Sequence, residues 1–181
     1  MPAVKPFRQY SEENVLAGFF RFSGTHPVTA GTFVKVNSGW AGDLHSSFLG
    51  GVGADYANEV SQRWGVPASV AACTTSGDVT IGMLLNDVRE VDENGEKLIY
   101  KRQKAIENGW VISGEGVNIV SKGFFIYSGV AGTPSPGAAA FLGTDGAINS
   151  SGTIANLAVT RVGTFLSPKD SSNWVLLKLD V

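Results

Sequence analysis

The residues that most often perform acid–base or nucleophilic chemistry are scarce in this chain. It contains two histidines, His26 and His45, and one cysteine, Cys73. A serine hydrolase needs a histidine that is held by a carboxylate beside a nucleophile on a strained turn, and no Gly-x-Ser-x-Gly elbow occurs. Both histidines lie in turn-like contexts, so we predict solvated loop residues and no enzymatic activity. Cys73 follows an apolar, strand-like run and is predicted to be a small buried hydrophobe.

Metal and cofactor sites are not indicated either. Zinc needs three or four close Cys, His or acidic ligands, which one cysteine and two distant histidines do not supply. Residues 90–101 start like a calcium loop, with Asp92, Asn94 and Gly95 at its third, fifth and sixth positions. The twelfth position is Lys101, which places a positive charge where a bidentate carboxylate is required. We therefore expect a solvated turn there, with no metal and no cofactor.

The composition favours a surface that contacts other proteins. Charged residues make up 17% of the chain and the net charge is −2, whereas an average soluble domain is roughly 25% charged. The surface must therefore be covered largely by small polar and apolar side chains, as at protein interfaces. The basic residues form no clustered face for direct nucleic-acid binding. No apolar stretch reaches a membrane span and no signal core is present, so we expect synthesis in the cytoplasm and no membrane contact.

Apolar runs separated by turn residues predict roughly ten short strands. They lie at residues 15–22, 28–36, 68–75, 79–85, 110–112, 117–120, 124–127, 138–142, 147–149, 159–166 and 174–179. The clearest hairpin is predicted between 68–75 and 79–85, and residues 143–146 form a second hairpin-type turn. Lys122 and Gly123 are expected to break the chain between two strands. Helices are predicted only at 55–64 and 98–108, where Gly109 suits the position after the helix end.

These elements predict an all-β fold with a single β-barrel or β-sandwich domain and one or two short helices. Parallel βαβ units are disfavoured because almost no helix lies between the strands. Residues 1–14 are polar, contain two prolines and lack an apolar period. We predict an extended N-terminal arm over 1–14 and the barrel or sandwich domain over 15–181.

Three parts of the sequence resemble a known class of proteins. They are EENVLAGFF (12–20) with GTFVKV (31–36), KRQKA (101–105) through WVISGEGV (110–117) and KGFF (122–125), and RVGTFL (161–166) through VLLKLDV (175–181). Together they resemble the head-decoration, or capsid cement, proteins of tailed bacteriophages and related virion structural proteins. The resemblance touches most of the chain and includes no catalytic signature.

The resemblance implies a protein on the capsid exterior of the virion that bridges neighbouring major-capsid subunits and stabilises the head against internal DNA pressure. Its partners would be the major capsid protein and copies of itself, as a dimer or trimer at lattice symmetry points. In this setting the arm would contact the capsid through Lys5, Arg8 and Tyr10, ordering on binding, or it would be a disordered terminus. The alternatives are a tail, head-fibre or adhesion module of a phage virion, and, as a third class, a glycan hydrolase on a β-scaffold.

Overall fold

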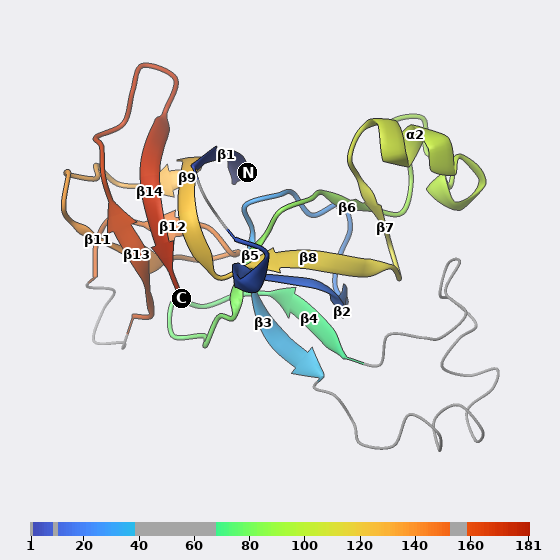
Figure 1. Ribbon diagram of the computed structural model, residues 1–181, viewed down its shortest axis with the longest axis horizontal. Helices are drawn as coiled ribbons and strands as arrows, with labels where there is room; N and C mark the ends of the chain where they lie inside the picture. The colour runs from blue at the N-terminus through green and yellow to red at the C-terminus, as the bar shows by residue number, and fades with distance from the viewer. Residues whose placement is uncertain (1, 9–10, 39–67, 153–158) are drawn as a thin grey trace.

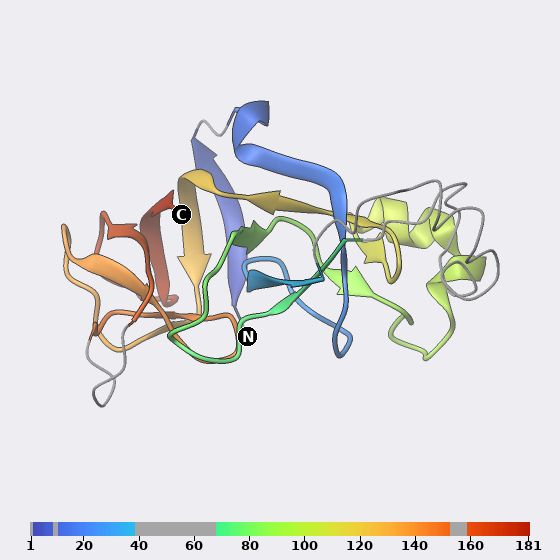
Figure 2. The same ribbon diagram turned by 90° about the horizontal axis from the view of Figure 1, so that it is seen from below.

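The computed structural model describes residues 2–8, 11–38, 68–152 and 159–181. A seven-stranded sheet forms one end of the molecule, a closed barrel of five strands lies in the middle, and a small helical lobe forms the other end (Figure 1). Figure 2 shows the same order of the three parts from below. The prediction of an all-β chain with barrel or sandwich architecture and short helices is confirmed. The predicted helix at residues 55–64 lies outside the described residues.

The barrel is built from strands that are distant in the sequence. Around the barrel they follow the order β2 (Val15–Phe22), β4 (Ser69–Ala72), β3 (Phe33–Ser38), β5 (Gly82–Leu84) and β8 (Gly116–Val120). Neighbouring strands are antiparallel except β2 and β4, which run parallel. Closure of the barrel removes the free edges that an open sheet of the same strands would expose.

The seven-stranded sheet uses both ends of the described chain. Its order is β1 (Ala3–Arg8), β9 (Lys122–Ser128), β14 (Trp174–Asp180), β13 (Arg161–Phe165), β11 (Ala139–Leu142), β12 (Ile148–Asn149) and β10 (Val130–Ala131). Only β10 and β12 pair in parallel. Residues 1–14, predicted as an extended arm, thus contain an edge strand of this sheet, followed by the short 3₁₀ helix η1 (Glu12–Asn14).

The helical lobe, residues 90–112, holds the 3₁₀ helix η2 (Leu98–Tyr100) and the α-helix α2 (Arg102–Glu107). The helix predicted at residues 98–108 is found as these two shorter pieces. Gly109 occupies the position after the helix end as predicted, with φ +66°. Its N–H donates to the carbonyl of Ile106 (3.1 Å), and the Trp110 N–H donates to the carbonyl of Ala105 (2.8 Å). The parallel strands β6 (Val88–Arg89) and β7 (Val111–Ile112) pair at the base of the lobe.

Three barrel strands place neighbouring residues in two different cores. One face contributes to a core shared with the seven-stranded sheet, through Phe33, Met83 and Val120. The other face contributes to a second core, through the sequence neighbours Val34, Leu84 and Ile119. Successive strand residues point to opposite faces, so each of these adjacent apolar pairs supplies one side chain to each core.

The chain passes from barrel to sheet without a loop. Strand β8 ends at Val120 and β9 begins at Lys122, so only Ser121 separates them. Its N–H and hydroxyl both donate to the carbonyl of Asn14, at 2.9 and 3.2 Å, which holds the end of η1 at this junction. The predicted break at Lys122 and Gly123 is wrong, because both residues belong to β9 and pair with β14.

The predicted pairing of residues 68–75 with 79–85 is also wrong. Strand β4 pairs with β2 and β3, while β5 pairs with β3 and β8, so β3 lies between the two segments. The strand predicted over 28–36 starts only at Phe33, and Val28 forms an isolated bridge with Val88. The turn predicted at 143–146 does join an antiparallel hairpin, β11 to β12.

The core contains one polar group without a partner. The Tyr127 side chain is fully buried, and its hydroxyl makes no hydrogen bond to the described residues. Burial raises the pKa of this phenol above its usual range. A buried hydroxyl without a partner costs about 1–3 kcal/mol of desolvation. We therefore expect Tyr127→Phe to keep or raise stability, by up to about 1 kcal/mol, in urea unfolding. A loss above about 1 kcal/mol would mean that the hydroxyl has a partner.

Candidate functional site

Large apolar side chains are exposed where the N-terminal segment enters the barrel. Phe7 of β1 is 51% exposed, and Leu16 and Phe19 of β2 are 42% and 43% exposed. Lys5 of β1 is also exposed. Three residues separate the end of β1 from the start of η1, so the two strands that carry these side chains follow each other closely in the sequence. We call Lys5, Phe7, Leu16 and Phe19 the N-terminal surface.

Strand β1 is held in place by pairing and by packing. It pairs antiparallel with β9, with Val4 opposite Tyr127 and Lys5 opposite Ile126. The Val4 side chain packs against the large core. The Lys5 ammonium lies 4.5 Å from the centre of the Trp174 ring on β14, an attractive cation–π contact. Lys5 is thus partly engaged within its own chain while its side chain remains exposed.

The outer edge of β1 is poorly suited to accept another strand. Pro6 has no N–H to donate, and the register with β9 shifts between Pro6 and Arg8. Proline, an irregular register and a lysine are devices that keep edge strands from pairing with other chains. Contacts made here would therefore use side chains, chiefly Phe7, and not added backbone pairing.

A bulge in β2 turns Phe19 outward. The pairing of β2 with β8 shifts between Ala17 and Phe20, and Gly18 in this interval has φ +67°, a conformation that glycine adopts without strain. Phe20 continues into the core, whereas Phe19 packs edge-on against it with ring centres 4.8 Å apart. The bulge therefore places one aromatic ring inside and its neighbour on the surface.

Sequence reasoning located this surface only in part. Of the predicted contact residues, Lys5 lies on it, Arg8 lies opposite Phe124 at the end of β1, and Tyr10 lies outside the described residues. The exposed Phe7, Leu16 and Phe19 were not predicted as contacts. The available signal was Gly18, because glycine inside an apolar strand pattern indicates a bulge.

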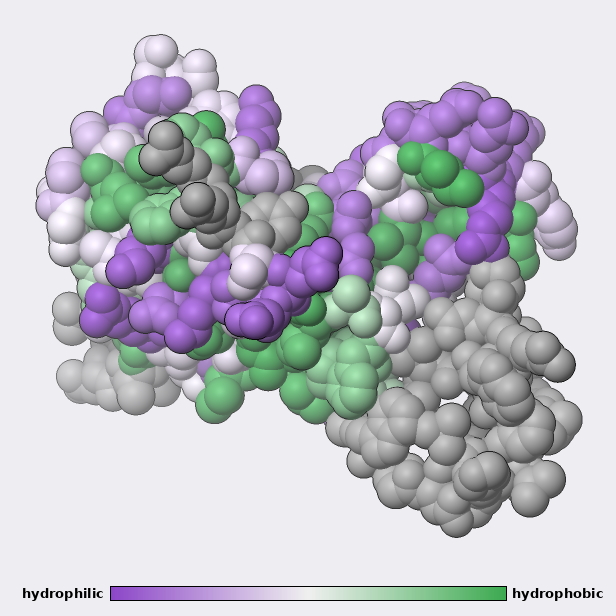
Figure 3. Space-filling model, in the orientation of Figure 1, coloured by the Kyte–Doolittle hydropathy of each residue, from purple (hydrophilic) through white to green (hydrophobic). Residues whose placement is uncertain are grey.

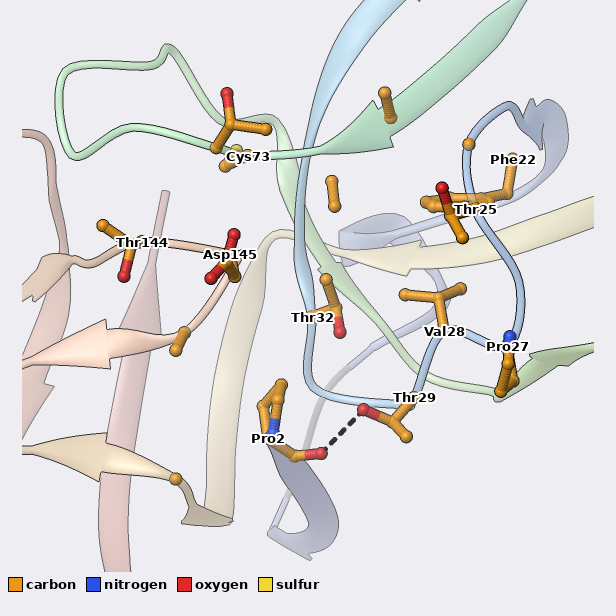
Figure 4. Close-up of a pocket in the computed structure, with 16 residues that line it drawn as sticks. Pro2, Phe22, Thr25, Pro27, Val28, Thr29, Thr32, Cys73, Thr144 and Asp145 are labelled. Carbon is orange, nitrogen blue, oxygen red and sulfur yellow. Dashed lines mark hydrogen bonds between the residues drawn. The ribbon is translucent and has the colours of Figure 1, made fainter.

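A groove of about 780 Å³ lies between the barrel and the seven-stranded sheet (Figure 4). It is lined by the loop from Phe22 to Thr32, by residues 71–74 and by the turn at Thr144 and Asp145. Pro2 closes one side, where its carbonyl accepts a hydrogen bond of 2.9 Å from the Thr29 hydroxyl. The lining is mainly apolar and hydroxyl-bearing, with Asp145 as its one charged side chain, so it suits an uncharged ligand more than an anionic one.

Cys73 also lines this groove but is not poised to react. It is buried, as predicted, and burial raises the pKa of its thiol to about 11, opposed by a hydrogen bond with Thr80. The thiolate is the nucleophilic form, and it is negligible near neutral pH at such a value. The thiol therefore serves as a small core residue.

His26 is not the solvated loop residue that the sequence predicted. It is half-buried, and its Nε2 lies 2.9 Å from the hydroxyl oxygen of Ser113. Its Nδ1 is buried and has no hydrogen-bond partner among the described residues. A hydrolytic triad has a carboxylate at this second nitrogen, so the pair lacks the group that would orient the base. His45 lies outside the described residues.

The calcium-like turn is held by a lysine. Asp92 is 5% exposed, so the prediction of a solvated turn is wrong for this residue. One carboxylate oxygen accepts the N–H groups of Asn94 (2.8 Å) and Glu96 (2.9 Å), and the other accepts a hydrogen bond from the Lys104 ammonium (2.9 Å). The bond from Lys104 is the main cause of the lowered pKa of Asp92. Across the described residues, no group of three potential metal ligands is present.

Within the described part of the chain, no helix is long and apolar enough to cross a membrane.

Three features of the described surface could bind a ligand or partner: the N-terminal surface, the groove and the helical lobe. No family model and no curated protein matches this chain.

Proposed function

We propose that this chain is a structural virion protein that docks on the outer surface of a tailed-phage capsid and bridges neighbouring major-capsid subunits. The observation that carries the proposal is the N-terminal surface, where Phe7, Leu16 and Phe19 are exposed on a rigid support of paired strands. The low charged fraction, 17%, and the resemblance of the sequence to capsid cement proteins support it.

The physical role follows from linkage. Packed DNA pushes a shell outward, and the joints between subunits are where the shell separates. A protein that binds across an intact joint better than across a ruptured one stabilises the intact state in proportion to that difference. Many identical copies on one shell multiply a modest contact energy.

The N-terminal surface is tested by removing its apolar side chains while keeping β1. Deletion of residues 1–14 is unsuitable, because it would remove an edge strand and the core contact of Val4. We expect Phe7→Ser with Leu16→Ser to weaken binding to capsids that lack this protein at least tenfold, which is a loss of about 1.4 kcal/mol, because a few large side chains dominate the energy of an interface. The measurement is the protein bound per capsid at increasing protein concentration.

Val79→Ser is the matched control. Val79 is 80% exposed and lies in the turn before β5, so it is an exposed apolar residue outside the N-terminal surface. Its affinity should stay within about twofold of wild type, because isolated exposed residues contribute little. Equal binding by the Phe7–Leu16 variant and wild type would remove the N-terminal surface from the mechanism.

The alternative is a tail, head-fibre or adhesion module of a phage virion. The observation that favours it is the groove of Figure 4, which is large enough for a small uncharged ligand. The two functions differ in copy number, because a capsid cement protein covers the head in many copies and a tail module occurs in few. Imaging of particles with and without the protein distinguishes them.

A further inference from the structure

The helical lobe exposes apolar side chains that its own folding does not need. Tyr100 is 84% exposed, Ile106 is 69% exposed and Ile99 is 42% exposed. All three lie in η2 and α2, within a stretch of eight residues. Figure 3 shows apolar surface on this lobe enclosed by hydrophilic surface. The small core of the lobe uses other side chains, namely Leu98, Ala105, Ile112 and Trp110.

The lobe is a rigid support for these side chains. Asp92 holds its turn through two backbone N–H groups and Lys104, as described above. At its base the Arg89 guanidinium lies 4.1 Å from the centre of the Trp110 ring. A surface that is ordered before binding loses less conformational entropy when a partner covers it.

The basic side chains of the lobe all lie beside acids of the same chain. Each of its four basic residues is ion-paired with an acid: Lys97 with Glu90, Lys101 with Glu96, Arg102 with Glu115, and Lys104 with Asp92 and Glu93. A nucleic acid or an anionic membrane would require free cations on this surface. Residues 90–112 also hold five acidic residues against four basic ones, which disfavours a polyanion and favours an apolar protein surface as the partner.

The apolar area is too small to hold a partner on its own. A fully covered aromatic side chain buries about 150–250 Å², so these three partly exposed side chains supply roughly half of the ~800 Å² per partner in a stable interface. A second copy of the chain would not stay bound through this area alone in dilute solution. A neighbouring protein that another contact already holds close would stay bound through this area, because its effective concentration is high.

We propose that the lobe is a second docking surface, whose occupant is an apolar patch on a capsid subunit adjacent to the one that holds the N-terminal surface. The inference rests on the proposed function, because the first contact supplies the effective concentration. The lobe lies at the end of the molecule opposite the seven-stranded sheet, which carries Lys5 and Phe7, while Leu16 and Phe19 lie on the barrel between these ends (Figure 1). Tyr100 and Ile106 are the side chains that enter the partner.

The test compares five proteins on capsids that lack this protein: wild type, the lobe variant Tyr100→Ser with Ile106→Ser, Tyr100→Phe, the Phe7–Leu16 variant and the Val79→Ser control. The lobe variant should bind at least tenfold more weakly than wild type, and Tyr100→Phe should retain binding because the ring is kept. Phe7 and Leu16 are about half covered, so thermal unfolding of every variant is measured and binding is compared at a temperature where all of them are folded. Wild type and the lobe variant should also show the same oligomeric state by sedimentation.

The outcomes separate the two proposals. If the lobe variant binds with wild-type affinity and the Phe7–Leu16 variant loses binding, the second docking surface is overturned and the proposed function stands. A change of oligomeric state in the lobe variant overturns the inference as well, because the occupant is then a second copy. Wild type that fails to bind capsids overturns both proposals.

Discussion

Replacing Gly82 by alanine is expected to destabilise the protein by about 3 kcal/mol or more. Gly82 has φ +149°, where residues with a side chain are strained. A Cβ atom there would overlap the carbonyl oxygen of Val120 and lie 2.8 Å from the Ile119 side chain. Strand β5 pairs with both β3 and β8, so separating it from β8 opens the barrel. Urea unfolding measures the loss as a lower midpoint.

Gly95→Ala is the matched control for backbone strain alone. Gly95 also has a positive φ, +80°, but no atom lies within 4 Å of the position that its Cβ would take. This variant should lose only about 1 kcal/mol, the usual cost of a left-handed conformation for alanine. If both variants lose the same amount, the close approach of β5 to β8 does not limit the barrel.

Replacing Asp78 by alanine is expected to cost about 2 kcal/mol at neutral pH. One carboxylate oxygen accepts the N–H groups of Thr74 (2.8 Å) and Thr75 (3.0 Å) and a hydrogen bond from the Lys35 ammonium (3.0 Å). Burial alone would raise the pKa of Asp78, but these bonds outweigh it and lower the pKa to about 2. The turn that contains Asp78 also contacts the segment before β13 of the seven-stranded sheet, because the Thr160 hydroxyl donates to the Asp78 carbonyl (2.8 Å).

The pH dependence has a defined sign. A carboxylate whose pKa is lower in the folded state stabilises the fold above its unfolded pKa, about 3.9, and this contribution disappears as the pH falls through the folded value. The difference between wild type and Asp78→Ala should thus narrow between pH 4 and about 2. A difference that stays constant over this range would show that the ionised form is not the stabilising one.

Asp170→Ala isolates the contribution of the lysine. Asp170 likewise accepts two backbone N–H groups, from Ser172 and Trp174, both at 2.8 Å, in the turn before β14. Asp170 forms no ion pair with the described residues, whereas Asp78 is paired with Lys35. A larger loss for Asp78→Ala than for Asp170→Ala measures the additional effect of the ammonium group.

Local signals in the sequence predicted much of the fold. The strand at residues 15–22 matches β2, and the turn between β11 and β12 is where Gly143 to Gly146 indicate it. These elements depend on residues that are adjacent in the chain. The pairing of 68–75 with 79–85 failed because β3 lies between them, and no local pattern indicates which distant strand will insert.

The candidate site was harder to predict because apolar residues in strands are usually core residues. Leu16 and Phe19 fit the pattern of a buried strand, and the bulge at Gly18 accounts for the exposure of Phe19. The N-terminal segment is polar with two prolines, yet it pairs with β9 and packs the partly buried Val4 side chain against the core. Asp92 became buried because Lys104, twelve residues later in the sequence, supplies its counter-charge.

The single residue between β8 and β9 has a mechanical consequence. Strand β8 is hydrogen-bonded to β2 and β5 of the barrel, and β9 to β1 and β14 of the sheet. Because only Ser121 separates the two strands, a force on the barrel is transmitted directly along the backbone to the seven-stranded sheet. Tension along β8 and β9 would stretch many interstrand hydrogen bonds at once, in shear. A flexible linker would instead let the barrel and the sheet rotate, so that these hydrogen bonds break one after another.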